Sequence, residues 1–385
     1  MNLLQGLFLG LLIICITACQ TIKQARLSSA VVLHDEVFSA FSEYSIESEA
    51  QIFALNDEAV AFVKQSLKGV FKPQEQIEAL VKNIFSRSRF NLLYRAEANT
   101  PASETFDMGA ANCLSMSIMT YALAKHAGFA VRFQDIEIPE YWTRREGQSL
   151  LNRHINLQIL PKSSQEKMHF ITRGFEVDFD AQASREHAPK TFVSIQQVLA
   201  MYYNNKGADA LLTDEYDKAY AYFRAAISHA PHSAPVLANL GYLYRLNGHK
   251  QFAEDAYLRA LDVDQDNLTA WGNLAYLYRH TERLAQAAQI SARIERKRVN
   301  NPFYHVSLGD EAFDKGHWQQ SLQHYRTALK LDKSYHEVFF GLAKTYHALG
   351  DIVRSKHYLT LAKNKARTQQ EEDSYQGKLA LLSRL

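Results

Sequence analysis

Three side chains in the middle of the chain have the types and the order that thiol chemistry needs. Cys113, His154 and Asp178 follow one another along the sequence. A thiolate can attack a carbonyl carbon, an imidazole can take up and return the proton, and a carboxylate can orient the imidazole. The sequence therefore predicts Cys113 as nucleophile, His154 as general base and acid, and Asp178 as orienter. Asp180 is a rival to Asp178, because it lies two positions further along.

The surrounding sequence predicts one helix and three strands that would position these side chains. The run from Cys113 to Gly128 is largely apolar and ends in glycine, which is typical of a buried helix. A thiol where a helix begins lies near unpaired N–H groups, which favour thiolate and can hold an oxyanion. Residues 130–138, 153–160 and 175–179 alternate apolar and polar side chains, as half-buried strands do. His154 and Asp178 then occupy polar faces, and antiparallel pairing would bring them together.

The rest of the region before these strands is predicted from periodicity and composition. Residues 25–100 read mostly as helices with apolar positions three and four residues apart, whereas residues 98–112 are small and polar and read as a loop. Residues 138–152 are longer than a hairpin needs. They are predicted to form either a flap over the site or a surface excursion.

The first 19 residues have the pattern of an export signal. Residues 6–18 form an apolar run that is short for a membrane span. The run ends in Ile16-Thr17-Ala18-Cys19, which resembles the lipobox of bacterial lipoproteins. We expect residues 1–18 to be a signal peptide and Cys19 to carry lipid, which leaves Cys113 as the one thiol of the mature chain. Gln20 after the lipidated cysteine implies an outer-membrane location facing the periplasm. The alternative is an uncleaved anchor helix.

From about residue 201 the sequence repeats every 34 residues, the length of a tetratricopeptide helix-turn-helix unit. Small residues recur in the first helix of successive units, at Gly241, Ala275, Gly309 and Ala343. The third unit is weak in its second helix, where Ser291 and Ile294 replace the usual aromatic residue and alanine. We predict about five units over residues 201–369 and a capping helix over residues 370–385. Such arrays stack into a groove that can bind a protein or peptide, and the alternative is a brace for the preceding domain.

Three runs around the predicted site resemble the transglutaminase-like superfamily, in the bacterial branch that precedes tetratricopeptide repeats. They are residues 112–129, 133–142 and 152–159. The resemblance implies a papain-like domain over residues 75–200, with the catalytic roles given above for Cys113, His154 and Asp178. The fold class predicted for the whole chain is an α+β papain-like or transglutaminase-like domain followed by an all-α tetratricopeptide solenoid. A helical segment over residues 19–74 would precede both.

Further polar residues near the predicted site are candidates for supporting roles. Asn112, Gln134 and Asn156 would support the triad or the oxyanion. We expect no cofactor and no metal, because the zinc-binding spacings Cys-x-x-Cys and His-Glu-x-x-His are absent from the sequence. A metal-dependent hydrolase using His154, His169 and Asp178 is a weaker alternative, because its ligands would be irregularly spaced.

Composition and charge restrict the classes of function. Hydrophobic residues make up 47% of the chain and charged residues 22%, as in ordinary globular proteins. A formal net charge of +2 gives no indication of nucleic-acid binding. We expect an envelope lipoprotein whose thiol site acts on a protein or peptide held by the repeats, as a peptidase or amidase or as an acyltransferase. The alternative is an interaction scaffold in which Cys113 and His154 are structural.

Overall fold

The computed structural model describes residues 32–86, 93–95, 98–145, 148–161, 174–179, 189–366 and 369–382. These residues form two compact units. One unit joins residues 32–48 to residues 195–291, and the other joins residues 49–194 to residues 292–385. The predicted signal peptide over residues 1–18 and the predicted lipidation site Cys19 lie outside the described residues. Among the helices that are described, none combines the length and the apolar character needed to cross a bilayer.

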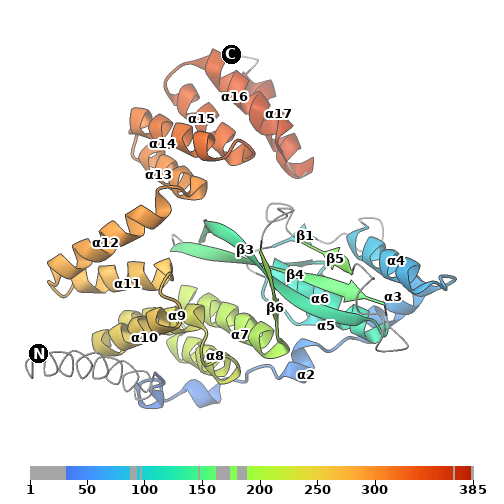
Figure 1. Cartoon of the computed structure of the whole chain (residues 1–385). Helices are drawn as coiled ribbons and strands as arrows, with labels where there is room; N and C mark the ends of the chain where they lie inside the picture. Colours follow the sequence, from blue (N-terminus) through green and yellow to red (C-terminus); the bar gives the residue numbers. More distant parts are fainter. Residues whose placement is uncertain are drawn as a thin grey trace, which may run out of the picture. The chain divides into compact units, whose positions relative to one another are not determined.

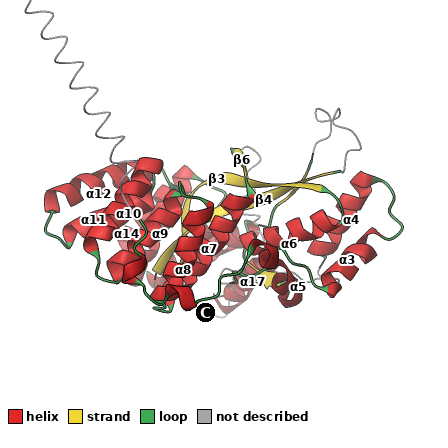
Figure 2. Cartoon of the chain, turned by 90° about the horizontal axis from the view of Figure 1, so that it is seen from below, coloured by secondary structure: helices red, strands yellow, loops and turns green. Residues whose placement is uncertain are grey.

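The first part of the second unit combines helices with an antiparallel sheet (Figures 1 and 2). Its helices are α2 (Glu49–Ile52), α3 (Asp57–Leu67), α4 (Pro73–Phe85), α5 (Ala102–Met108) and α6 (Cys113–His126). Its strands are β1 (Leu93–Tyr94), β2 (Ala110–Ala111), β3 (Ala130–Arg145), β4 (Gln148–Leu160), β5 (Phe175–Val177) and β6 (Lys190–Val193). Strands β3 to β6 form one sheet in the order β5-β4-β3-β6, and β1 pairs with β2 in parallel. This part of the chain is therefore α+β.

The helices predicted over residues 25–100 are only partly present. Residues 32–48 contain two short 3-10 turns, η1 (Asp35–Val37) and η2 (Phe41–Glu43), in place of a helix. The next predicted helix is interrupted at Asn56, whose side chain accepts a hydrogen bond from the N–H of Ala59 at 2.9 Å. An N-cap of this kind begins a new helix, so α3 starts afresh after the break. Phe38 explains why residues 32–48 form no long helix. Its side chain is 2% exposed because it packs against the repeat helices.

The loop predicted over residues 98–112 contains the helix α5, so that prediction is wrong. Pro101 directly precedes the first turn, and Gly109 ends the helix with a φ of 59°. Ala102 and Thr105 are each 0% exposed. Their spacing of three puts them on one helix face. The side chains of Ala102 and Thr105 are small, yet they are buried because α5 lies close to its neighbours. The small and polar composition of residues 98–112 did not indicate this helix.

Within the described residues, 138–145 belong to strand β3 and 148–152 belong to strand β4. Strand β3 runs to Arg145 and β4 begins at Gln148, with a register shift between Ile136 and Tyr141. The side chains of residues 137–153 lie outside the described ones. Strand β6, which the sequence analysis did not identify, pairs antiparallel with β3.

An apolar row across the sheet supports the helix that begins at Cys113. Phe133 pairs in register with Leu157, and Leu157 pairs with Val177. All three are at most 1% exposed. The ring of Tyr121 in α6 stacks on Phe133 with centroids 4.8 Å apart. Burial of these side chains fixes α6 against β3, which restricts where the first residue of α6 can lie.

The repeats form five consecutive helix pairs followed by one more helix. The bounds are α7 (Ile195–Leu212), α8 (Tyr216–His229), α9 (Ala234–Leu246), α10 (Lys250–Val263), α11 (Leu268–Arg279), α12 (Leu284–Arg298), α13 (Pro302–Asp314), α14 (Trp318–Leu331), α15 (His336–Ala348), α16 (Ile352–Asn364) and α17 (Gln369–Leu382). The tetratricopeptide solenoid predicted from the 34-residue period is thus present as paired helices. The helix α17 occupies most of the stretch where we expected a capping helix.

Small residues in the first helix of a pair face aromatic rings in the second. A Cβ placed on Gly241 would lie 2.6 Å from the ring of Tyr257, and one placed on Gly309 would lie 2.7 Å from the ring of Tyr325. The sequence predicts this close approach from the recurrence of small residues. In the third pair the corresponding residue is Ser291, and the only buried residues of α12 are Ala287 and Ile290. The boundary between the two units falls directly after Ser291, where the repeat lacks its aromatic side chain.

Candidate functional site

Cys113 is the first residue of α6, and the residues before it fix this helix start. The side chain of Asn112 accepts a hydrogen bond from the N–H of Ser115 at 2.9 Å and donates another to Asn99. The hydroxyl of Ser115 accepts from the N–H of Thr100 at 3.0 Å. Cys113 itself is half-buried, and it is the free cysteine of the residues that the structure describes. The thiol is therefore held where the N–H groups of a helix are unpaired.

His154 lies in β4 and connects the thiol with a carboxylate. Its Nε2 atom is 2.8 Å from Oδ1 of Asp178, which follows β5 directly. Cys113 also interacts with this imidazole and raises its pKa. The structure thus brings together the three residues that the sequence analysis placed in one site.

The surroundings of His154 change its proton affinity in opposing directions. Burial lowers its pKa, because a charged ring is costly away from water. The hydrogen bonds with Asp178 and Cys113 and the charges of both partners outweigh this cost and raise the pKa to about 9. The net effect favours the protonated form of the ring. A protonated imidazole beside a sulfur atom is an arrangement found in thiol nucleophiles.

The three supporting residues proposed from the sequence have different surroundings. Gln134 pairs in register with Asn156, and Ile136 pairs with His154, so both amides share the sheet face of His154. Gln134 is 5% exposed and Asn156 2%, and Oε1 of Gln134 and Oδ1 of Asn156 have no hydrogen-bond partner among the described residues. Asn112 instead caps α6. Its contribution is to position Cys113, and the residues Asn99 and Thr100 that help it were not anticipated from the sequence.

Two residues weighed as alternatives cannot be compared with this geometry. Asp180 and His169 lie outside the described residues. Within the described ranges, no three His, Cys, Asp or Glu side chains group as metal ligands would.

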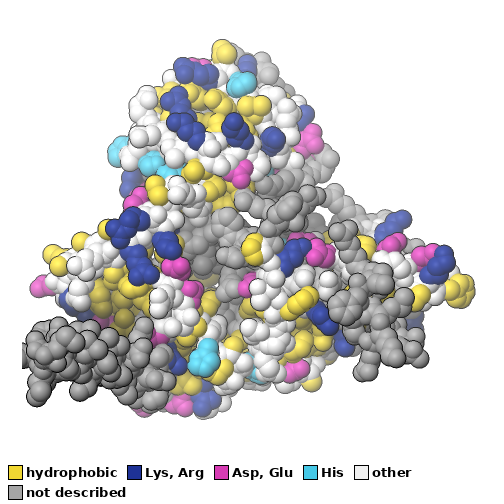
Figure 3. Space-filling view, viewed as in Figure 1, with side chains coloured by type: hydrophobic (Ala, Val, Ile, Leu, Met, Phe, Trp, Pro, Cys, Tyr) yellow, Lys and Arg dark blue, Asp and Glu magenta, His cyan; other side chains and the backbone are white. Residues whose placement is uncertain are grey.

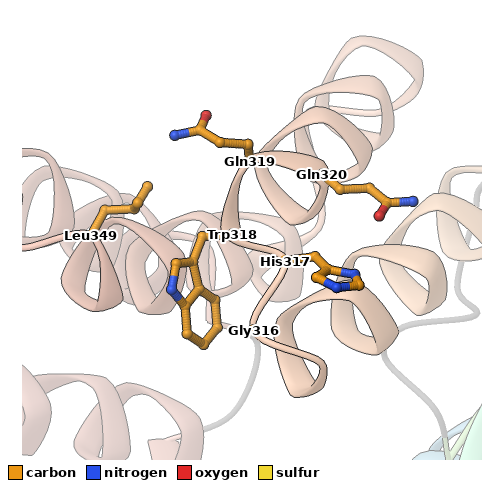
Figure 4. Close-up of a pocket in the computed structure, with 6 residues that line it drawn as sticks. All are labelled: Gly316, His317, Trp318, Gln319, Gln320 and Leu349. Atoms are coloured by element: carbon orange, nitrogen blue, oxygen red, sulfur yellow. The ribbon is translucent and has the colours of Figure 1, made fainter.

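A pocket of about 380 Å³ lies elsewhere, at the turn between α13 and α14. It is lined by Gly316, His317, Trp318, Gln319, Gln320 and Leu349. Trp318 and Leu349 lie on one side of the start of α14, and His317 and Gln320 lie on the other (Figure 4). None of Cys113, His154 or Asp178 contributes to the lining, so this pocket is separate from the thiol site.

Comparison with known families identifies the repeats. Residues 239–302 match the family described as tetratricopeptide repeat, and residues 309–350 match a second family of the same kind, described as TPR repeat. The chain therefore contains tetratricopeptide repeats, and this half of the predicted fold class is confirmed. A curated relative, the uncharacterized protein ycf37 of Guillardia theta, is 34% identical over 79 residues. The match covers 20% of this chain and 44% of that relative, so it spans less than half of the relative's length.

Several solved repeat proteins are also similar over part of the chain. YrrB, described as a TPR protein with an unusual peptide-binding site, is 16% identical, with 46% of this chain and 92% of that chain covered and a TM-score of 0.26. PilF of Pseudomonas aeruginosa is 17% identical, with 49% and 94% covered and a TM-score of 0.29. MamA is 15% identical, with 43% and 91% covered and a TM-score of 0.26. TM-scores this low carry no argument about fold or function.

Proposed function

We propose that the repeats bind a protein or peptide partner. The observation that carries this proposal is the match of residues 239–302 and 309–350 to tetratricopeptide repeats, because stacked repeats of this kind present an extended binding surface. On the face seen in Figure 3, hydrophobic side chains lie among charged ones of both signs. A mixed surface of this kind suits a protein partner better than a uniformly charged polymer.

A cluster on the first helices of the second and third pairs is a suitable contact point. The guanidinium of Arg245 lies over the rings of Tyr242 and Tyr276, at 4.7 and 4.4 Å from their centroids. The ring of His280 stacks on Tyr276, which remains 42% exposed. Aromatic and arginine side chains dominate the binding energy of many protein interfaces.

Affinity capture with matched variants tests the partner-binding proposal. Full-length chain would be immobilised and exposed to an envelope extract, and retained proteins would be identified by mass spectrometry. Tyr276→Ala combined with Arg245→Ala should lose a partner that Lys330→Ala, a change in α14, retains. Retention of the same proteins in equal amounts by both variants would argue against a binding role for this cluster.

The second candidate function is thiol acyl transfer at Cys113. The contact of His154 with both Asp178 and Cys113 supports it. The Cys113 sulfur would attack an amide carbonyl and form a thioester, and the proton held by His154 would pass to the leaving amine as the C–N bond breaks. Water would then attack the thioester, give its proton to His154, and release the acid and the thiolate. An amine in place of water would give a new amide, so the same site suits an amidase or peptidase and an acyltransferase.

Alkylation of Cys113 tests this second candidate. The purified chain would be treated with iodoacetamide at neutral pH, and the rate would be followed at the Cys113 peptide by mass spectrometry. His154→Ala should slow the reaction by at least tenfold, because the thiolate loses its cationic neighbour. His126→Ala, at the exposed end of the same helix, should leave the rate unchanged. If Cys113 reacts with iodoacetamide only after denaturation, the thiol is buried in the core and the acyl-transfer candidate is wrong.

The location of the protein in the cell envelope is part of the same proposal. The pattern Ile16-Thr17-Ala18-Cys19 supports a lipid anchor on Cys19, and a diacylated N-terminus would hold the protein on a membrane. The repeats and the thiol site would then both lie on the periplasmic side. Cys19→Ala should release the protein from outer-membrane vesicles into the soluble fraction. Unchanged fractionation would contradict the anchor.

A further inference from the structure

Residues 32–48 are held on helices α7 to α10 by contacts of the kind that hold a bound peptide. The hydroxyl of Tyr244 donates to the carbonyl oxygen of Val32 at 2.7 Å and accepts from the N–H of His34 at 3.1 Å. One side chain therefore pairs with two backbone groups of the segment. Hydrogen bonds to the backbone of a bound peptide contribute affinity whatever the peptide sequence. Specificity comes from neighbouring sites that accept particular side chains.

One aromatic and one acidic side chain of the segment occupy such neighbouring sites. Phe38 is 2% exposed and stacks on the ring of Tyr220 with centroids 4.6 Å apart. Asp35 accepts hydrogen bonds from the Tyr220 hydroxyl at 2.8 Å and from Nε of Arg224 at 3.0 Å. The Arg224 hydrogen bond lowers the pKa of Asp35. The repeats thus recognise a carboxylate three residues before an aromatic ring.

A second acidic side chain is held at the other end of the segment. The carboxylate of Glu47 lies 3.3 Å from Nζ of Lys206 and accepts from the Tyr222 hydroxyl at 3.1 Å. The hydroxyl of Tyr203 donates to the backbone carbonyl of Glu47 at 2.6 Å. Lysine, arginine and tyrosine hydroxyls on the repeats therefore match the acidic groups of the segment.

The close approach of the two helices within each pair does not involve this segment. The rings of Phe223 and Tyr257 fill the space beside Gly207 and Gly241 within each helix pair. The ion pair of Asp35 with Arg224 stays at the surface, with side chains 46% and 42% exposed, and exposed pairs stabilise a fold little. Tyr220 and Tyr244, each 0% exposed, are in contact with the segment, so its departure would uncover their side chains.

We propose that this surface of α7 to α10 is a recognition site for a peptide with an aromatic residue between two acidic ones, and that the chain fills it with its own residues 32–47. The inference deepens the first proposed function and depends on it for the existence of an outside partner. That partner is a segment of another protein with the same acidic and aromatic chemistry. It competes with a tethered segment whose effective concentration is on the order of millimolar.

A labelled peptide with the sequence of residues 32–48 tests the proposal on the full-length chain. The unmodified chain should bind it weakly, because its own segment fills the site. Asp35→Ala combined with Phe38→Ala in the chain should raise the affinity for the peptide at least tenfold. Adding Arg224→Ala and Tyr244→Phe to that variant should remove the gain, and a peptide carrying Phe38→Ala should not bind. Equal binding by the unmodified chain and the double variant would overturn the proposal.

A cleavable chain keeps the test informative if the double variant fails to fold. A protease site would be inserted after Ser48, and the cut chain would be incubated with excess labelled peptide. Exchange of the native segment for the peptide, with unchanged circular dichroism, supports the proposal. Loss of helical signal on cutting, or a segment that never exchanges, would show a structural brace. Either result leaves the Tyr276 and Arg245 capture experiment unaffected, so the two proposals fail separately.

Discussion

Nε2 of His154 lies 2.8 Å from Oδ1 of Asp178, and Cys113 also interacts with the same ring. The carboxylate is one of the groups that keep this buried ring protonated. Asp178→Asn removes that charge, while burial continues to lower the pKa of His154. We expect the pKa of His154 to fall from about 9 toward its ordinary value of 6.5. Histidine NMR titration measures it, with His154→Asn identifying the signal. A value unchanged in Asp178→Asn would contradict the assigned role.

The raised pKa of His154 also predicts how stability changes with pH. The folded value of about 9 exceeds the ordinary value of 6.5, so folding takes up a proton between these limits. The resulting stabilisation is fully present below about pH 6.5 and is lost as pH rises through 9. The free energy of unfolding should fall by at most about 1.4 kcal/mol per pH unit in this window. Urea unfolding should show a shallower dependence for His154→Asn than for the unmodified chain, and equal slopes would contradict the assignment.

The cap of α6 should influence both stability and the reactivity of Cys113. Asn112→Ala removes the acceptor for the Ser115 N–H and should lower the free energy of unfolding by about 1 kcal/mol. Asn267 caps α11 in the same way, accepting from Ala270 at 2.9 Å, and is the matched control. Both variants should lose similar stability, but only Asn112→Ala should slow iodoacetamide labelling of Cys113. Equal labelling in both would show that the thiol does not depend on this cap.

The close contact of Gly241 with Tyr257 should tolerate no added methyl group. Gly241→Ala places a Cβ 2.6 Å from the ring, so it should lower the free energy of unfolding by about 1–3 kcal/mol. Gly272 in α11 has no atom within 4 Å of the same position. There the alanine should stabilise the helix by about 0.5–1 kcal/mol. Thermal unfolding of the two variants should therefore shift in opposite directions.

Helix α12 should open more readily than the corresponding helices of the other pairs. It buries only Ala287 and Ile290, whereas α10 buries five residues. Few buried contacts give a low free energy of local opening. Amide hydrogen exchange should be faster in α12 than in α10 or α14 under native conditions. Equal protection of the amides of α12, α10 and α14 from exchange would show that other contacts stabilise α12 in place of the aromatic side chain missing at Ser291.

Local patterns predicted the parts of the fold that depend on neighbouring residues. The 34-residue period gave the helix pairs, because each pair packs within itself and against the next. The apolar run after Cys113 and the alternation around His154 gave α6 and β4. The β4–β5 register continues so that Asp178 lies opposite Asn156, and the Asp178 side chain reaches His154 diagonally, two positions along β4 on the same face. The catalytic assignment of these three residues stays a prediction.

Contacts between distant parts of the sequence could not be predicted in the same way. The apolar residues of the segment around Phe38 look like a helix stripe, yet they serve contacts with Tyr220 in α8. The helix α5 escaped notice because its buried residues, Ala102 and Thr105, are too small or too polar to mark a hydrophobic face. The extension of β3 to Arg145 depends on its pairing with β4 and has no clear signal in composition.

The hydrogen bond from Tyr203 to Glu47 spans 156 positions of sequence. Residues 49–194 are therefore enclosed in a large loop whose two ends are fastened to the same helices. During synthesis, Phe38 and Glu47 leave the ribosome long before the repeats that receive them, and closing so large a loop carries an entropic cost. We expect the segment to dock last, so newly made chains expose it for a time to whatever else can hold an acidic aromatic stretch.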